Sequence, residues 1–192
     1  KFDLILSIGV LEWIGAFRES NQPPEEIQKE FLSKIRTDLD DRGKLIIGIE
    51  NRLGLKYLLG ANDDHTGIPN ISCFSKDLAR EKFEQQTNKE LICITYNFKE
   101  YQNLLLKSGF QKIIFYAALP DYKLPEKIFP LSGDQTKCEL NKFILEDRRV
   151  DEHDGTNGKK LENQDEIWSI YNSLAEIGIA HYFAPSFYIE AY

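Results

Sequence analysis

Two short, nearly continuous apolar runs stand near the start of the chain, at residues 2–8 and 44–49. Runs of this kind are typical of strands buried on both faces, as in a parallel sheet. Between them, residues 23–39 begin with prolines and glutamates and continue with apolar residues at helical spacing, which predicts an amphipathic helix. Strand, helix and strand in this order predict a βαβ unit with a right-handed crossover.

Four further helices are expected, and apolar residues at helical spacing predict the last two of them. The expected helical segments are residues 53–59, 76–83, 97–108 and 166–178. The third of these ends at Gly109, a residue that commonly stops a helix.

β-branched and aromatic residues predict two more strands, at residues 111–119 and 186–192. The segment between them contains several prolines and a polar, charged stretch at residues 132–166. Within that stretch, residues 151–160 are predicted to be an exposed excursion.

The composition excludes several classes of protein. The chain of 192 residues has 24 basic and 31 acidic side chains, a net charge of −7, which argues against nucleic acid and anionic membrane surfaces as partners. No apolar run approaches the roughly 18–20 residues that span a bilayer, so no membrane span is expected. Three cysteines without a CxxC pair argue against a disulfide scaffold or zinc ribbon and favour a cytoplasmic location.

Candidate chemistry begins where the two apolar runs end, because open α/β sheets bind ligands at the carboxyl ends of their strands. Residues 7–13 and 50–54 are the two segments in question. Gly9 would let a ligand approach the backbone, and Trp13 could stack on an aromatic ring. The alternative is that Gly9 only forms a turn and that Trp13 packs in the core.

Two other loops carry polar side chains. Asp63, Asp64 and His65 are consecutive and could supply a general base or metal ligands, although three adjacent residues cannot all converge on one metal. A solvated turn is the alternative. Asp121 and Lys123 lie between prolines, which either hold them toward a site or only route the chain. The sequence contains no P-loop, GxSxG or HExxH motif.

Several of these segments together resemble the C-terminal half of class I S-adenosylmethionine-dependent methyltransferases. Phe2-Asp3-Leu4-Ile5 followed by Val10-Leu11-Glu12-Trp13 is similar to the FDxI…VLEH pattern of that superfamily's fourth strand, with Trp13 where histidine is often found. Residues 39–47 resemble the LKPGGxLxI turn into the fifth strand. Both motifs are degenerate, but their order and separation agree with the superfamily.

A narrower resemblance is to methyltransferase domains associated with glycosyltransferases of bacterial surface-polysaccharide synthesis. It covers most of residues 2–130 and the last ten residues. The segments that carry it are Ile49–Tyr57, Asp64–Gly67, Phe115-Tyr116, Pro120–Pro125 and Phe183–Phe187.

The resemblance implies an α/β fold with a partial Rossmann-like methyltransferase sheet. The strands would be equivalent to strands 4, 5, 6 and 7, with the last antiparallel to its neighbours and helices on both faces. Residues 1–192 would form a single partial domain, with residues 120–182 inserted between the last two strands. The glycine-rich first strand and the acid after the second strand, which build most of the superfamily's cofactor site, have no counterpart in a chain that begins at strand four.

The resemblance also implies the cofactor and the site residues. S-adenosylmethionine is the expected cofactor, its binding weak or absent without the N-terminal half, and the expected acceptor is a sugar or glycan-linked group. No metal is expected. His65 is the candidate general base, oriented by Asp64. The candidate cofactor contacts are Ile8, Gly9, Val10 and Trp13, and the candidate acceptor contacts are Glu50, Asn51, Asp121 and Lys123.

A non-catalytic reading remains open, in which the domain docks onto a glycosyltransferase partner or fused domain. Polar groups kept on three separate loops favour the enzyme, and the missing cofactor half favours the interaction module. The apolar edge at residues 2–8 is prone to pair with another chain. We therefore expect a homodimer or another device that covers this edge.

Overall fold

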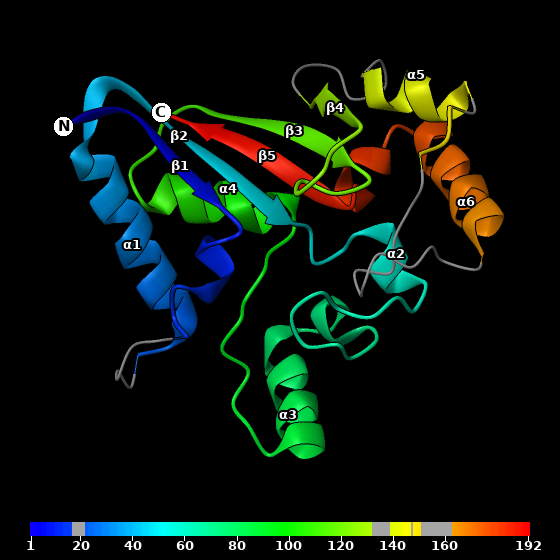
Figure 1. Cartoon of the computed structure of the whole chain (residues 1–192), viewed down its shortest axis with the longest axis horizontal. Coiled ribbons are helices and arrows are strands. Elements are labelled where there is room, and N and C mark those ends of the chain that lie inside the picture. Colours follow the sequence, from blue (N-terminus) through cyan, green and yellow to red (C-terminus); the bar gives the residue numbers. More distant parts are fainter. Residues whose placement is uncertain (17–21, 132–138, 147, 151–162) are drawn as a thin grey trace.

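The computed structural model describes residues 1–16, 22–131, 139–146, 148–150 and 163–192. They form an open, mixed five-stranded sheet with the order β1-β2-β5-β3-β4 (Figure 1). β1 and β2 are parallel, whereas β5 is antiparallel to both β2 and β3, and β4 is antiparallel to β3. The strands are β1 Phe2–Ile8, β2 Leu39–Glu50, β3 Ile113–Leu119, β4 Lys127–Pro130 and β5 Ser186–Ala191.

Helices connect the strands and close the core. They are α1 Pro24–Asp38, α2 Leu55–Leu58, α3 Lys76–Thr87, α4 Phe98–Lys107, α5 Glu139–Leu145 and α6 Gln164–Glu176. Short 3₁₀ turns occur at Leu11–Trp13, Ile71–Cys73 and Ala180–Phe183.

Most of the predicted elements are confirmed. α4 begins where local chemistry requires it, because Asn97 and Glu100 form a reciprocal capping box. The prediction missed β4 and α5, which lie between residues 119 and 166, where no helix or strand was expected. β2 also begins directly after α1, so the turn expected around Gly43 is part of the strand.

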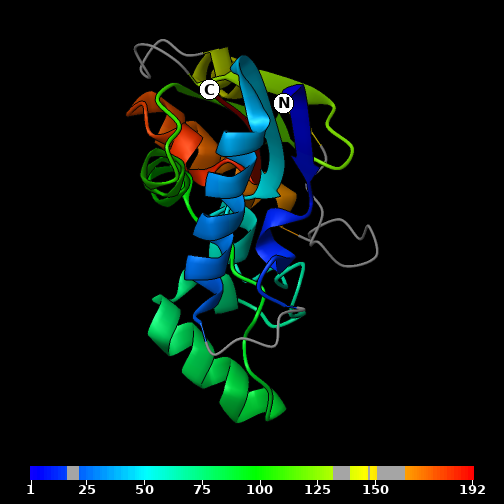
Figure 2. The same ribbon diagram turned by 90° about the vertical axis from the view of Figure 1, so that its left-hand side faces the viewer.

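The core lies on one face of the sheet, where α1 and α4 pack side by side (Figure 2). Leu32 and Ile35 of α1 belong to the same buried cluster as Leu45 and Ile47 of β2. Toward β4 the cluster continues through Phe143 of α5, whose ring lies 4.9 Å from that of Phe129. α1, α4 and α5 therefore contribute to one continuous core.

The other face is largely uncovered at β1. Leu4, Leu6 and Ile8 are 47%, 61% and 41% exposed. The expectation of a first strand buried on both sides is therefore wrong, and the helices expected on both faces do not cover this face at β1 among the described residues. An apolar run shows that both faces of a strand are hydrophobic, but it does not show that other parts of the chain cover both faces. Along its outer edge, β1 pairs with none of the described strands.

Among the described helices, none combines the length and the apolar character needed to cross a membrane.

Candidate functional site

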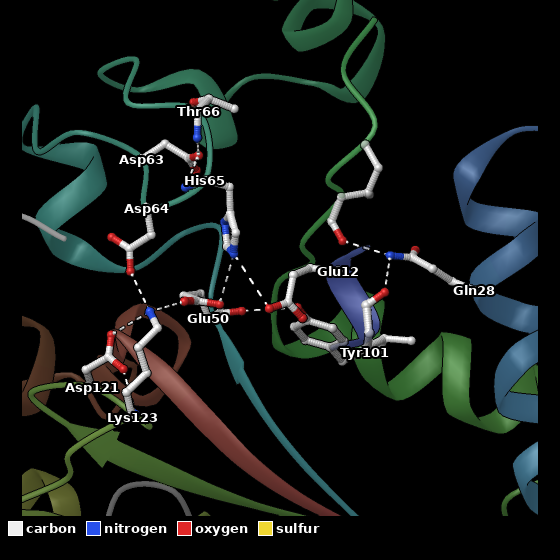
Figure 3. Close-up of polar contacts among 12 residues, drawn as sticks. Glu12, Gln28, Glu50, Asp63, Asp64, His65, Thr66, Tyr101, Asp121 and Lys123 are labelled. Atoms are coloured by element: carbon white, nitrogen blue, oxygen red, sulfur yellow. Dashed lines mark hydrogen bonds and ion pairs between the residues drawn. The ribbon is translucent and has the colours of Figure 1, made fainter. Parts of the chain in front are cut away.

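Two buried glutamates meet at the carboxyl ends of the parallel strands β1 and β2. Glu12 lies in the 3₁₀ turn that follows β1, and Glu50 is the last residue of β2. Both are only 1% exposed. The loop that follows α2 reaches over them and presents His65 to both carboxylates (Figure 3).

His65 is held between the two glutamates. Its Nε2 lies 3.6 Å from Oε1 of Glu12 and 3.6 Å from Oε2 of Glu50. Burial alone would lower the pKa of the imidazole, but its interactions with Cys93 and Glu12 and the charge of Glu50 outweigh burial and raise the pKa to about 11. His65 is therefore an imidazolium at neutral pH.

Asp63 shapes the loop that carries His65. Its Oδ1 accepts hydrogen bonds from the backbone N–H groups of His65 and Thr66 and from the Thr66 hydroxyl. This is the local turn chemistry that aspartate favours. Asp63 thus positions His65 without facing the two glutamates.

Lys123 gathers the remaining acidic side chains. Its Nζ lies 2.5 Å from Oε1 of Glu50, 3.2 Å from Oδ2 of Asp64 and 3.7 Å from Oδ2 of Asp121. The buried Lys56 approaches the other Asp64 oxygen at 3.6 Å. Burial would raise the pKa of Asp64, but the two lysines outweigh it and lower that pKa.

For Glu50 the balance is reversed. Burial raises the pKa of this carboxyl group, and the charges of His65 and Lys123 offset only part of the rise. Burial therefore makes Glu50 more basic than Asp64. Glu50 is also the carboxylate that contacts both His65 and Lys123.

Tyr122 forms one wall of the site by packing across two glycines. A Cβ atom on Gly48 would lie 2.9 Å from Cδ2 of Tyr122, and one on Gly9 would lie 2.8 Å from its hydroxyl oxygen. Gly9 also has a φ of +64°, which a side chain would strain. The ring is 2% exposed, and burial raises the pKa of its phenol, with Glu50 and Glu12 adding to the rise.

Hydrogen bonds from the core fix the backbone of both glutamates. The Gln28 amide donates to the carbonyls of Leu11 and Ile94, and the Ile94 N–H donates to the carbonyl of Glu12. The Tyr101 hydroxyl donates to the carbonyl of Glu50. The carboxylates are thus attached to rigid elements.

The structure brings together five of the predicted site residues: Glu50, Asp64, His65, Asp121 and Lys123. It does not pair Asp64 with His65, since the Asp64 carboxylate contacts Lys56 and Lys123. Figure 3 shows the contact with Lys123. Asn51 also points elsewhere. Its amide donates to the carbonyls of Tyr182 and Ala184 at 2.8 Å, which anchors the turn before β5.

The predicted cofactor contacts border the site at the end of β1. Ile8 and Val10 leave 41% and 42% of their surface exposed on either side of Gly9. The Trp13 ring packs edge-on against His65, with ring centroids 5.4 Å apart. Their role toward a cofactor stays a prediction.

Sequence reasoning missed three contributors: Glu12, Lys56 and Tyr122. The signal for Glu12 was present, because it is a carboxylate just after a predicted strand, as Glu50 is. Lys56 and Tyr122 carried no comparable signal, since a lysine in a short helix and a tyrosine in a loop are ordinary.

The geometry allows proton transfer between the imidazole and a carboxylate, hydrogen bonding to a polar ligand at the exposed Lys123 side, and cation binding. The potential metal-ligand atoms of Glu12, Glu50 and His65 all lie within 4.8 Å of one another, as do those of Glu50, Asp64 and Asp121.

Neither a protein-family model nor a curated protein matches the chain.

Proposed function

We propose that this chain carries the acceptor side of a methyltransferase site that uses S-adenosylmethionine and a sugar or glycan-linked hydroxyl. The observation that carries the proposal is the meeting of Glu12, Glu50 and His65 at the carboxyl ends of two adjacent parallel strands. The strand order, with β5 antiparallel between β2 and β3, agrees with the arrangement that the sequence resemblance implies.

S-adenosylmethionine supplies an electrophilic methyl group on a sulfonium. The exposed apolar side chains of Ile8 and Val10 beside Gly9 fit its contact with the end of β1. On the other side of the site, half-exposed Lys123 and the neighbouring Asp121 carboxylate suit hydrogen bonds to sugar hydroxyls.

The acceptor hydroxyl must lose a proton, and two groups compete to take it. His65 is the base expected from the sequence, but its raised pKa keeps it protonated at neutral pH. We therefore propose that Glu50, whose pKa is raised by burial, is the base that takes the proton from the acceptor hydroxyl. The His65 imidazolium orients the Glu50 carboxylate. Such a base contributes about 10²–10⁴-fold to a rate, and positioning supplies much of the remainder.

The alternative is a non-catalytic module that docks onto a glycosyltransferase. The uncovered apolar side chains of β1 favour it, since exposed apolar surface of this kind often marks an interaction site. It differs from the first proposal in one measurable respect, because it requires binding without turnover.

The test is methyl transfer from tritiated S-adenosylmethionine to nucleotide sugars and lipid-linked glycans, with the protein expressed from its complete coding sequence. We expect turnover in the unmodified protein, a loss of about 10²-fold in kcat for Glu50→Gln, and no loss for Glu176→Gln, an exposed matched control. His65→Ala should lower kcat while sparing cofactor affinity.

The same assay separates the alternatives. If Glu50→Gln retains full kcat while His65→Ala loses it, His65 is the base. No turnover with any of these acceptors, together with stable capture of a glycosyltransferase, would leave the docking module as the function.

A further inference from the structure

Two buried carboxylate oxygens at the centre of the site have no hydrogen-bond donor. They are Oε2 of Glu12 and Oε2 of Glu50, and neither finds a partner among the described residues. Both side chains are 1% exposed, so water does not satisfy them from the surface. Buried carboxylate oxygens are normally paired or bound to a metal, and the His65 side chain, 3.6 Å from each glutamate, makes no hydrogen bond to either of these two atoms.

His65 faces the same two carboxylates from a third direction. The potential ligand atoms of the three residues lie within 4.8 Å of one another, and the imidazole nitrogen is 3.6 Å from each glutamate. Ligands that bind one metal at about 2.0–2.2 Å can be up to about 4.3 Å apart. The observed spacing therefore accommodates one ion after a shift of less than about 1 Å.

The neighbouring set of carboxylates already holds a cation. Glu50, Asp64 and Asp121 all contact the Lys123 ammonium, which occupies the position that an ion would take there. Lys123 approaches Glu50 through Oε1, and the Oε2 atom of Glu50 stays turned toward His65. Among the described residues, no lysine or arginine occupies the corner that contains Glu12 and His65 in this way.

We propose that Glu12, Glu50 and His65 form a binding site for one divalent cation of the manganese type. Carboxylates suit Mg²⁺, Ca²⁺ and Mn²⁺, and the imidazole disfavours the all-oxygen shells of the first two, so we commit to Mn²⁺. The ion takes the place of the His65 proton, which is released to solvent because a metal binds the neutral imidazole, and it then orients Glu50 as the imidazolium does without it. In the complex with acceptor, the ion's open positions take hydroxyl oxygens of the sugar. This last role rests on the proposed methyl transfer, but the binding of the cation does not.

Mn²⁺ alone is the probe, added to the chain without cofactor or acceptor. Trp13 is a built-in reporter because its ring lies 5.4 Å from that of His65, and Trp168→Phe removes the only other tryptophan. We expect 1:1 binding by calorimetry with a micromolar Kd, together with quenching of Trp13 fluorescence at the same stoichiometry.

Variants locate the ion. Glu12→Gln and His65→Asn should each raise the Kd at least tenfold, and Asp121→Asn, which alters only the set occupied by Lys123, should change it less than twofold. If circular dichroism shows that Glu12→Gln is unfolded, His65→Gln replaces it.

The proposal is overturned if the unmodified chain binds no Mn²⁺ at millimolar concentration, or if binding is unchanged in the Glu12 and His65 variants. Mn²⁺ binding that these variants abolish, in a protein that transfers no methyl group, would support the cation site while rejecting the proposed function.

Discussion

Among the described residues, His65 and His181 have surroundings that give them different charge states. His65 lies between Glu12 and Glu50, and its pKa is raised to about 11. His181 is 3% exposed and packs against the rings of Phe98 and Tyr182, where burial, with a smaller effect of Lys99, lowers its pKa to about 4.

The contrast shows that burial by itself does not decide the state of a histidine. An apolar, aromatic environment disfavours the imidazolium, whereas two carboxylates at 3.6 Å reverse that preference. The charged histidine belongs to the cluster at the strand ends, and the neutral one belongs to the packing beside β5. The following predictions test the two environments in order of expected effect.

Replacement of His65 by leucine should have the largest effect. It leaves Glu12 buried beside Glu50 without the cation that both contact, and breaking a buried pair in this way costs about 3–5 kcal/mol. Urea unfolding at neutral pH measures the loss. The double variant His65→Leu/Glu12→Gln, which also removes one buried charge, should recover part of it. A loss below about 1 kcal/mol would contradict the charged state assigned to His65.

His181 should make the fold sensitive to acid. Its folded pKa of about 4 lies below the ordinary value of 6.5, so its contribution is fully present above pH 6.5 and disappears as the pH falls toward 4. The contribution lost reaches about 3 kcal/mol, or about 1.4 kcal/mol per pH unit.

The test compares the unfolding free energy of the unmodified chain with that of His181→Gln from pH 7.5 to pH 4. The difference between the two isolates the contribution of His181 from that of other titrating groups. The two curves should converge as the pH falls. Parallel curves would mean that His181 titrates normally in the folded chain.

Lys123→Met should cost less than His65→Leu, although both remove a cation from Glu50. The Lys123 side chain is 51% exposed, so water screens its ion pairs and we expect a loss of about 1 kcal/mol. The loss should shrink in 0.5 M salt, and the His65→Leu effect should not. Equal salt dependence in the two variants would remove the distinction between them.

Asp121→Asn should have the smallest effect. Its carboxylate lies 3.7 Å from Lys123, which keeps shorter contacts with Glu50 and Asp64. We expect a change of about 0.3 kcal/mol in thermal or urea unfolding. A loss comparable to that of Lys123→Met would show that Asp121 is an essential member of the cluster.

Local signals predicted much of the fold. The βαβ unit followed from two apolar runs around an amphipathic helix, and α4 followed from helical spacing that ends at Gly109. β4 escaped notice because its four residues include Pro130 and occupy a segment dense in prolines. Its place in the sheet depends on pairing with β3, which no local pattern encodes.

The site was less predictable because its contacts are distant in sequence. Lys123 reaches Glu50 across 73 residues, and the Asn51 amide is drawn away by the carbonyls of Tyr182 and Ala184, more than 130 residues along the chain. Glu12 depends on the Gln28 and Ile94 contacts that hold its turn. Sequence reasoning found the loops, but tertiary packing decided which side chains face one another.

The position of β5 has a consequence for how the protein is made. β5 is the strand that joins the β1–β2 pair to the β3–β4 pair, so a chain growing from the ribosome can form each pair early but cannot unite them until residues 186–191 have emerged. Glu12 and Glu50 belong to the first pair, and Lys123 lies in the loop of the second. The complete polar cluster therefore assembles only after β5 has been synthesised, and a nascent chain would expose two unmatched strand edges until then.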